Sequence, residues 1–136
     1  MNPILKNILA VVGGWFIGSV VNMSLIMLGP IIIANPEGFD NSNMDVMAET
    51  IHLLQPINYL FPFLAHALGT LVGSFLAAKI AVNRKMIFAF VMGGLFMLGG
   101  IVNVIMLPGP MWFNIVDLIL AYIPMSWLAL RIVKNS

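Results

Sequence analysis

The stretch LAHALGTLVGSFLAAKI, residues 64–80, decides the fold. Almost every residue in it is apolar, and a small residue stands at every fourth position. These small residues are Ala65, Gly69, Gly73 and Ala77. At this spacing they line one side of an α-helix and let a second helix approach closely within a bilayer. The stretch therefore predicts a closely packed transmembrane helix over about residues 56–81.

The composition of the whole chain also indicates a membrane protein. Of its 136 residues, 61% are hydrophobic and 8% are charged, whereas about a quarter of the residues in a soluble domain are charged. The mean hydropathy is +1.04. Each crossing needs about 20 apolar residues, and three further stretches fit that length, over about residues 5–28, 86–107 and 111–133. We therefore expect one all-α domain, residues 1–136, folded as a four-helix transmembrane bundle.

Charged residues predict the orientation of this bundle. All six Lys and Arg residues lie at the N-terminus, around the turn after the second stretch, or near the C-terminus. Four of the five acidic residues lie in the first connection: Glu37, Asp40, Asp45 and Glu49. Basic residues beside transmembrane helices stay cytoplasmic, so we expect both termini inside and the acidic connection outside. The first apolar stretch is longer than the hydrophobic region of a signal peptide, and we expect it to be retained.

Two pairs of predicted helices resemble each other in sequence. Residues 13–30 read GGWFIGSVVNMSLIMLGP and residues 93–110 read GGLFMLGGIVNVIMLPGP, while SFLAAKI at 74–80 matches SWLALRI at 126–132. Equivalent helices cross in the same direction, so the pattern predicts two similar helical hairpins in a parallel repeat. The alternative is a chance match, because Gly, Ile, Met and Leu are common in membrane helices.

The acidic connection contains a predicted short amphipathic helix over about residues 42–54. Ser42 is placed to cap its first turn, with Asp45 three residues on. Apolar residues recur at helical spacing on one face: Met44, Met47, Ile51 and Leu54. This helix is either a lid over the outer mouth of the bundle or a solvated connector whose apolar face touches the membrane surface.

The first and third predicted helices carry small residues as well. The first has Gly14, Gly18 and Asn22 at a spacing of four, and the third has Gly99 followed by Asn103. We expect such faces to hold helix backbones close together. Each Asn lies one turn beyond a Gly, so its side chain is expected to point inward.

Strongly polar side chains lie in the outer half of the predicted helices: Asn22, His66, Asn103 and Asp117. A polar group is costly in hydrocarbon, so these side chains are expected to meet one another or water. One interpretation is an outward-facing polar pocket, with Asp117 and His66 in one hydrogen-bonded network. The other is a set of interhelical hydrogen bonds that only fix the register of the helices. Pro124 is expected to kink the fourth helix.

Few residues are available for catalysis or for a cofactor. The chain has no Cys, which excludes disulfides and thiolate chemistry. Glu49 and His52 form a single Glu-x-x-His pair, whereas a carboxylate metal site in a bundle uses two. The net charge of +1 without a basic patch argues against nucleic acid. We expect a protein in the lipid bilayer that is not an enzyme and has neither metal nor cofactor.

Two segments, HALGTLVGSFLAAKIA at residues 66–81 and LPGPMWFNIVDLILAYIPM at residues 107–125, are similar to a group of small four-helix membrane proteins of bacteria. The resemblance implies a bacterial inner membrane and no particular activity. Two functions remain open. The first is a membrane component that associates with a second copy or another membrane protein through its Gly and Ala faces. The second is ligand binding or transport at the outer polar pocket.

Overall fold

The computed structural model of the chain describes residues 1–135, which form α-helices and short 3-10 helices. Within this part of the chain, four helical stretches are long and apolar enough to cross a membrane. This confirms an all-helical architecture with four candidate spans. The elements are α1 (Pro3–Ile32), α2 (Met44–Thr50), η1 (Ile51–Leu53), η2 (Pro56–Tyr59), α3 (Leu60–Ile80), α4 (Lys85–Met106), α5 (Met111–Leu120) and α6 (Ile123–Lys134).

The first helix is longer than the sequence predicts. The Asn2 side chain accepts a 2.8 Å hydrogen bond from the Ile4 amide and caps the first turn. Pro3 occupies the first helical position, where its missing amide proton breaks no helical bond. At the other end the helix continues through Pro30 and ends at Ile32, so it adds a turn that we had assigned to the connection.

The fourth candidate span is two helices, α5 and α6. Pro124 lies in the first turn of α6, where a proline is well tolerated. Tyr122, two residues earlier, has φ −118° and ψ −80°, which lies outside the helical region. The predicted kink is therefore a complete break in the helix.

The predicted helix in the first connection is present, but its cap is different. The Asn43 side chain accepts a 2.9 Å hydrogen bond from the Val46 amide and caps α2. The Ser42 amide instead donates to Asp40 Oδ1 at 2.8 Å. The predicted capping role of Ser42 is wrong, because the helix starts one residue later than a Ser42 cap would require.

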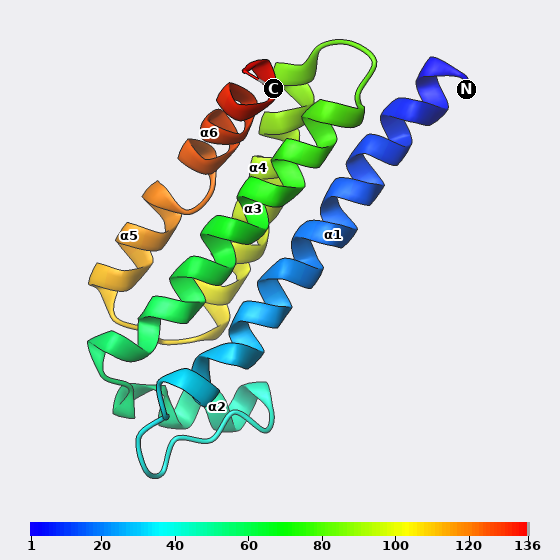
Figure 1. Cartoon of the computed structure of the whole chain (residues 1–136). Coiled ribbons are helices and arrows are strands. Elements are labelled where there is room, and N and C mark those ends of the chain that lie inside the picture. Colours follow the sequence, from blue (N-terminus) through cyan, green and yellow to red (C-terminus); the bar gives the residue numbers. More distant parts are fainter. Residues whose placement is uncertain (136) are drawn as a thin grey trace.

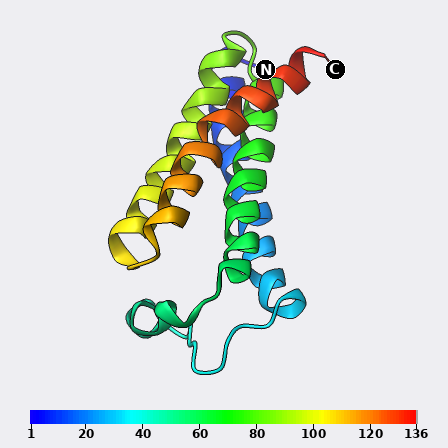
Figure 2. The same ribbon diagram turned by 90° about the vertical axis from the view of Figure 1, so that its left-hand side faces the viewer.

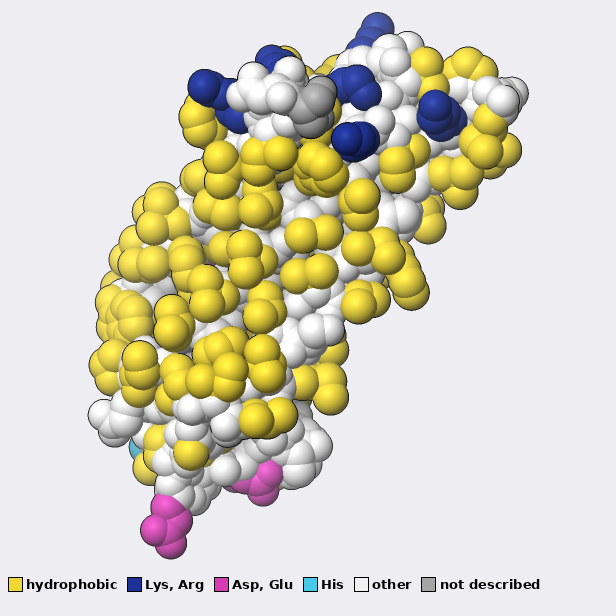
Figure 3. Space-filling view, viewed as in Figure 1, with side chains coloured by type: hydrophobic (Ala, Val, Ile, Leu, Met, Phe, Trp, Pro, Cys, Tyr) yellow, Lys and Arg dark blue, Asp and Glu magenta, His cyan; other side chains and the backbone are white. Residues whose placement is uncertain are grey.

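The central helix of the bundle is α3. It packs against α1 on one side and against α4 and α6 on another (Figures 1 and 2). Both chain ends and the α3–α4 turn lie at one end of the bundle, and α2 lies at the other (Figure 1). Lys and Arg side chains gather at the first end, Asp and Glu at the second, and apolar side chains cover the region between them (Figure 3). We refer to these as the basic end and the acidic end.

Helices α1 and α3 touch through their backbones. A Cβ atom added to Gly14 would lie 2.6 Å from the carbonyl oxygen of Gly73. One added to Gly18 would lie 2.6 Å from the carbonyl oxygen of Gly69. Only glycine fits at such a distance, so α1 and α3 pack closely at these glycines, within a single chain. The other predicted small residues of the α3 face are fully buried as well: Ala65 and Ala77.

The packing of α4 uses different glycines from those the sequence indicated. Gly99 is exposed, and a Cβ atom there would meet no atom within 4 Å. Its predicted packing role is therefore wrong within this bundle. Gly100 lies instead against the Tyr122 ring, and Gly93 lies against the Ser126 side chain.

The two glycine pairs that mark the predicted repeat have opposite roles. In α1, a Cβ atom at Gly13 would meet nothing within 4 Å, whereas Gly14 packs against α3. In α4, Gly93 packs against α6, whereas Gly94 is open. Aligned residues therefore face in different directions, and the packing does not follow the register of the sequence repeat.

Buried hydroxyl groups join α3, α4 and α6 in the half of the bundle nearer the basic end. Ser74 Oγ donates to the carbonyl oxygen of Ala89 at 3.1 Å. Ser126 Oγ lies 2.8 Å from Ser74 Oγ and is the donor in this pair, because the Ser74 proton is already used. Both serines are fully buried, so these bonds satisfy polar groups that would otherwise be costly in the core.

Candidate functional site

His66 of α3 and Asp117 of α5 are in direct contact. His66 Nδ1 lies 2.8 Å from Asp117 Oδ1. The second carboxylate oxygen, Asp117 Oδ2, accepts a 3.0 Å hydrogen bond from the Tyr122 hydroxyl. Asp117 is only 3% exposed. The structure thus places the two predicted residues together and adds a third, and we refer to His66, Asp117 and Tyr122 as the buried triad.

The break between α5 and α6 positions the Tyr122 side chain. The Ala121 amide donates to the Asp117 carbonyl at 2.9 Å and closes the last turn of α5. The chain then leaves helical geometry at Tyr122. Gly100 of α4 leaves room for the Tyr122 ring, and the His66 ring stacks on it with centroids 6.0 Å apart. These contacts hold the hydroxyl on the carboxylate.

Sequence analysis did not identify Tyr122 as a site residue. It is 1% exposed and is the largest fully buried side chain in the described part of the chain. A signal for it was present, because a tyrosine within an apolar helix needs a partner for its hydroxyl. Asp117, five residues earlier, was the nearest acidic residue.

The buried triad lies beside a cavity of about 130 Å³ near the acidic end. His66, Asp117 and Asn103 contribute to its wall. Its other lining residues are mainly apolar or aromatic, and among them are Ile26, Met47, Ile51, Leu54, Tyr59, Val104, Leu107 and Phe113. An apolar cavity with a few convergent polar groups is the usual form of a small-molecule site.

Asn22 is separate from this cavity. It packs on α3, where a Cβ atom added to Gly69 would lie 3.0 Å from Asn22 Cβ. Of the four predicted polar residues, three therefore share one cavity wall: His66, Asn103 and Asp117. The expectation that Asn22 joins them is wrong, because its position on α1 places it in the close contact between α1 and α3.

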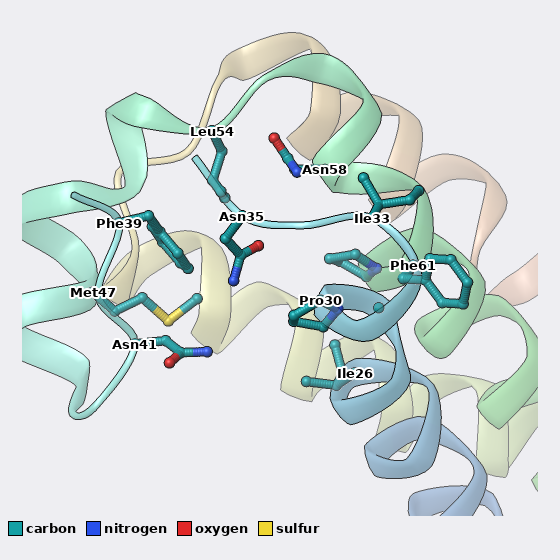
Figure 4. A pocket seen from close by; sticks show the side chains of 12 residues that line it. Ile26, Pro30, Ile33, Asn35, Phe39, Asn41, Met47, Leu54, Asn58 and Phe61 are labelled. Carbon is teal, nitrogen blue, oxygen red and sulfur yellow. The ribbon is translucent and has the colours of Figure 1, made fainter. Parts of the chain in front are cut away.

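A second cavity of about 90 Å³ adjoins the first, and the two share Ile26, Met47, Leu54 and Pro62 in their linings. Its polar lining residues are asparagines: Asn35, Asn41 and Asn58. Figure 4 shows loop side chains, including Met47, across this cavity from Ile26 and Pro30 of α1. Met47 and Leu54 come from the first connection, which therefore covers the cavities at the acidic end of the bundle, an arrangement that favours the lid interpretation.

The loop over these cavities carries negative charge. It contains four acidic residues: Glu37, Asp40, Asp45 and Glu49. The backbone amide of Ser42 donates to Asp40 and holds the pKa of that carboxyl below its ordinary value. Asp40 therefore keeps its negative charge to a lower pH than an ordinary aspartate does. The field at the acidic end favours positively charged molecules.

The second ring nitrogen of His66, Nε2, can accept a hydrogen bond when the ring is neutral. An ionised Asp117 accepts a proton carried on Nδ1, and a neutral ring then keeps a lone pair on Nε2. The His66 side chain is 14% exposed and lines the cavity. A ligand N–H or O–H group can therefore donate to it from the cavity.

Comparisons with known proteins assign no role to this site. No protein-family model, curated protein or solved structure matches the chain. Within residues 1–135, no three His, Cys, Asp or Glu side chains form a group that could hold a metal ion. An inference about a ligand therefore rests on the walls, the polar groups and the charge of the cavities.

Proposed function

We propose that this chain is an integral membrane protein that binds a small ligand from the outer side of a bacterial inner membrane. The observation that carries the proposal is the contact of His66 with Asp117 in the wall of the cavity of about 130 Å³, which we refer to as the outer cavity. Ionisable residues are costly inside a membrane bundle and usually mark the path or the site of an ion, proton or ligand. The protein acts by binding and not by catalysis, and it uses no cofactor.

A single Cys substitution tests whether the cavity can be reached from outside. The chain has no native Cys, so Asn103→Cys places one reactive thiol in the cavity wall. We expect a small impermeant thiol reagent, added from the outer side, to label this variant. The matched control is Ser74→Cys, because Ser74 is fully buried in the same bundle and should not react. If both positions are equally protected from the reagent, the cavity is not accessible from outside and the proposed outward-facing site is wrong.

The proposed orientation has both termini and the α3–α4 turn in the cytoplasm. It rests on the gathering of Lys and Arg at the basic end and on the positive-inside rule. Single variants Asp45→Cys and Arg84→Cys report the two sides separately. We expect the impermeant reagent to label Asp45→Cys on intact cells, and to label Arg84→Cys only after the membrane is opened. The reverse labelling pattern would show that the protein has the opposite orientation in the membrane.

Transport is a second candidate, favoured by the position of the helix break. Broken helices line the substrate sites of many transporters, and the two halves can move separately. Here α5 and α6 separate at Ala121 and Tyr122, one helical turn after Asp117. Counterflow of a bound ligand in proteoliposomes distinguishes transport from binding alone, since a receptor would bind the ligand without moving it.

Association with a second copy or another membrane protein is a separate proposal with less support. The predicted Gly and Ala faces of α1 and α3 are occupied by each other within one chain. Gly99 alone among the predicted packing residues keeps an open side. A duplicated hairpin also stays a proposal, supported by the sequence match alone. Cross-linking in native membranes, with Gly99→Leu as the variant, tests the association.

A further inference from the structure

We propose that the outer cavity takes a small organic cation, an ammonium group carried on a short apolar body. This inference rests on the proposed function and adds the chemical class of the ligand. Three independent features support it: the charge at the mouth, the composition of the walls, and the acceptors of the buried triad.

The distribution of charge favours a cation at the mouth of the cavity. Asp117 is the single acidic residue within the spans, and the other four acids lie in the loop above it. All six Lys and Arg residues lie in or beside the elements that meet at the basic end. A cleft with one sign of charge and apolar walls concentrates ions of the opposite sign.

The walls of the cavity suit the apolar body of such a cation. Leu54, Val104 and Leu107 provide aliphatic surface. Tyr59 and Phe113 lie together in the lining, with ring centroids 4.6 Å apart, and aromatic faces attract ammonium groups. The volume of about 130 Å³ is well below the several hundred Å³ of a drug-sized site. The fitting ligand is therefore a short aliphatic ammonium ion.

The buried triad supplies the acceptor and the balancing charge. An ammonium N–H group can donate to Nε2 of a neutral His66, whose Nδ1 proton is held by Asp117 at 2.8 Å. The carboxylate then offsets the positive charge through the imidazole ring. The Tyr122 hydroxyl keeps Asp117 Oδ2 in place at 3.0 Å. A neutral alcohol could use the same acceptor but would gain nothing from the carboxylate.

The test compares isobutylammonium with isobutanol, which share a carbon skeleton and differ in the charge of the head group. The full chain is placed in nanodiscs, and binding is followed by a ligand-observed NMR titration. Empty nanodiscs correct for partition into lipid. We expect isobutylammonium to bind at least about tenfold more tightly than isobutanol, a difference of about 1.4 kcal/mol. The variant Asp117→Asn should reduce this ratio to near one.

A second variant protects the test against misfolding of Asp117→Asn. Asp45 and Glu49 are exposed on α2, so their joint replacement by Asn and Gln leaves the bundle core untouched. This variant should weaken binding of the ammonium and not of the alcohol. Equal binding of both probes to the unmodified protein would overturn the cation inference and leave the outward-facing site intact. Binding of neither probe would overturn the proposed function as well.

Discussion

The two sides of α3 are built in different ways. Towards α1 the contact is made by backbone on backbone, with Gly14 and Gly18 against Gly69 and Gly73. Towards α4 and α6 it is made by side chains that reach across, such as Ser74, whose Oγ bonds to the Ala89 carbonyl of α4 and to Ser126 Oγ of α6. Where the two backbones touch, between Gly14 and Gly18 of α1 and Gly69 and Gly73 of α3, there is no room for a cavity. Side chains that bridge a wider gap leave room for one. The buried triad and its cavity lie on the α4 and α6 side of α3.

The difference also concerns what each interface can tolerate. A backbone carbonyl cannot move aside for a new methyl group without shifting its whole helix, whereas a side chain can change its rotamer. The α1 side should therefore fail abruptly on substitution. The α4 and α6 side should lose stability in smaller steps, one hydrogen bond at a time.

The largest expected effect comes from a matched pair of neighbouring glycines in α1. Gly14→Leu would drive its side chain into the Gly73 carbonyl oxygen, 2.6 Å from the new Cβ atom. We expect it to lower the free energy of unfolding by about 3 kcal/mol or more. Gly13→Leu, one residue earlier, meets nothing within 4 Å and should be nearly neutral. Unfolding in mixed micelles measures the free energy of unfolding of both variants. Similar losses of stability in the two would contradict a backbone contact at Gly14.

The next effect concerns the carboxylate on the opposite side of α3. Asp117→Ala would leave His66 Nδ1 and the Tyr122 hydroxyl without their partner in a buried site. Each unsatisfied group costs about 1–3 kcal/mol. The His66 side chain is 14% exposed, so its cost should be at the low end, and we expect a total loss of about 2–3 kcal/mol in the same unfolding assay. Asp117→Asn keeps polar atoms in place and should lose less. If the alanine variant is as stable as the asparagine variant, the triad does not hold this side together.

The packing on the α1 side could be predicted from the sequence, and on the other side the pairing of His66 with Asp117 could be predicted as well. Small residues at a strict spacing of four specify a packing face directly, which is why Gly14 and Gly69 were found. On the other side, the contact depends on where a helix breaks. Pro124 predicted a kink but not that Tyr122 would turn onto Asp117. Gly100 packs in the bundle and Gly99 does not, because the Tyr122 ring lies against Gly100. No rule based on the spacing of small residues could reveal this.

Asn22 and Asn103 show the same limit for the candidate site. Both follow a glycine by one turn or nearly so, and the sequence treats them alike. Asn103 faces the cavity, whereas Asn22 lies in the α1–α3 contact. The role of each asparagine depends on the residues that surround it in three dimensions. The sequence pattern along one helix does not show which residues of other helices these are.

The smallest expected effect tests whether the two glycine pairs are equivalent. Gly93→Ala would place a methyl group against the Ser126 side chain, whereas Gly94→Ala would meet nothing within 4 Å. Because Ser126 can move at the expense of its bond to Ser74, we expect Gly93→Ala to cost about 1–2 kcal/mol. Gly94→Ala should be neutral. An in-register repeat of α1 would give the opposite order, with the second glycine of the pair as the sensitive one.

The length of α1 links the second cavity to the thickness of a surrounding bilayer. Its 30 residues extend about 45 Å, whereas the hydrocarbon core of a bilayer is about 30 Å thick. In the proposed membrane location, the helix would have to tilt steeply or project beyond the core, and its last turns, at Gly29 and Pro30, line the second cavity. A thin bilayer would leave that cavity among hydrated head groups, and a thick one would draw it among acyl chains. Hydrophobic mismatch would thus decide whether a ligand arrives from water or from lipid.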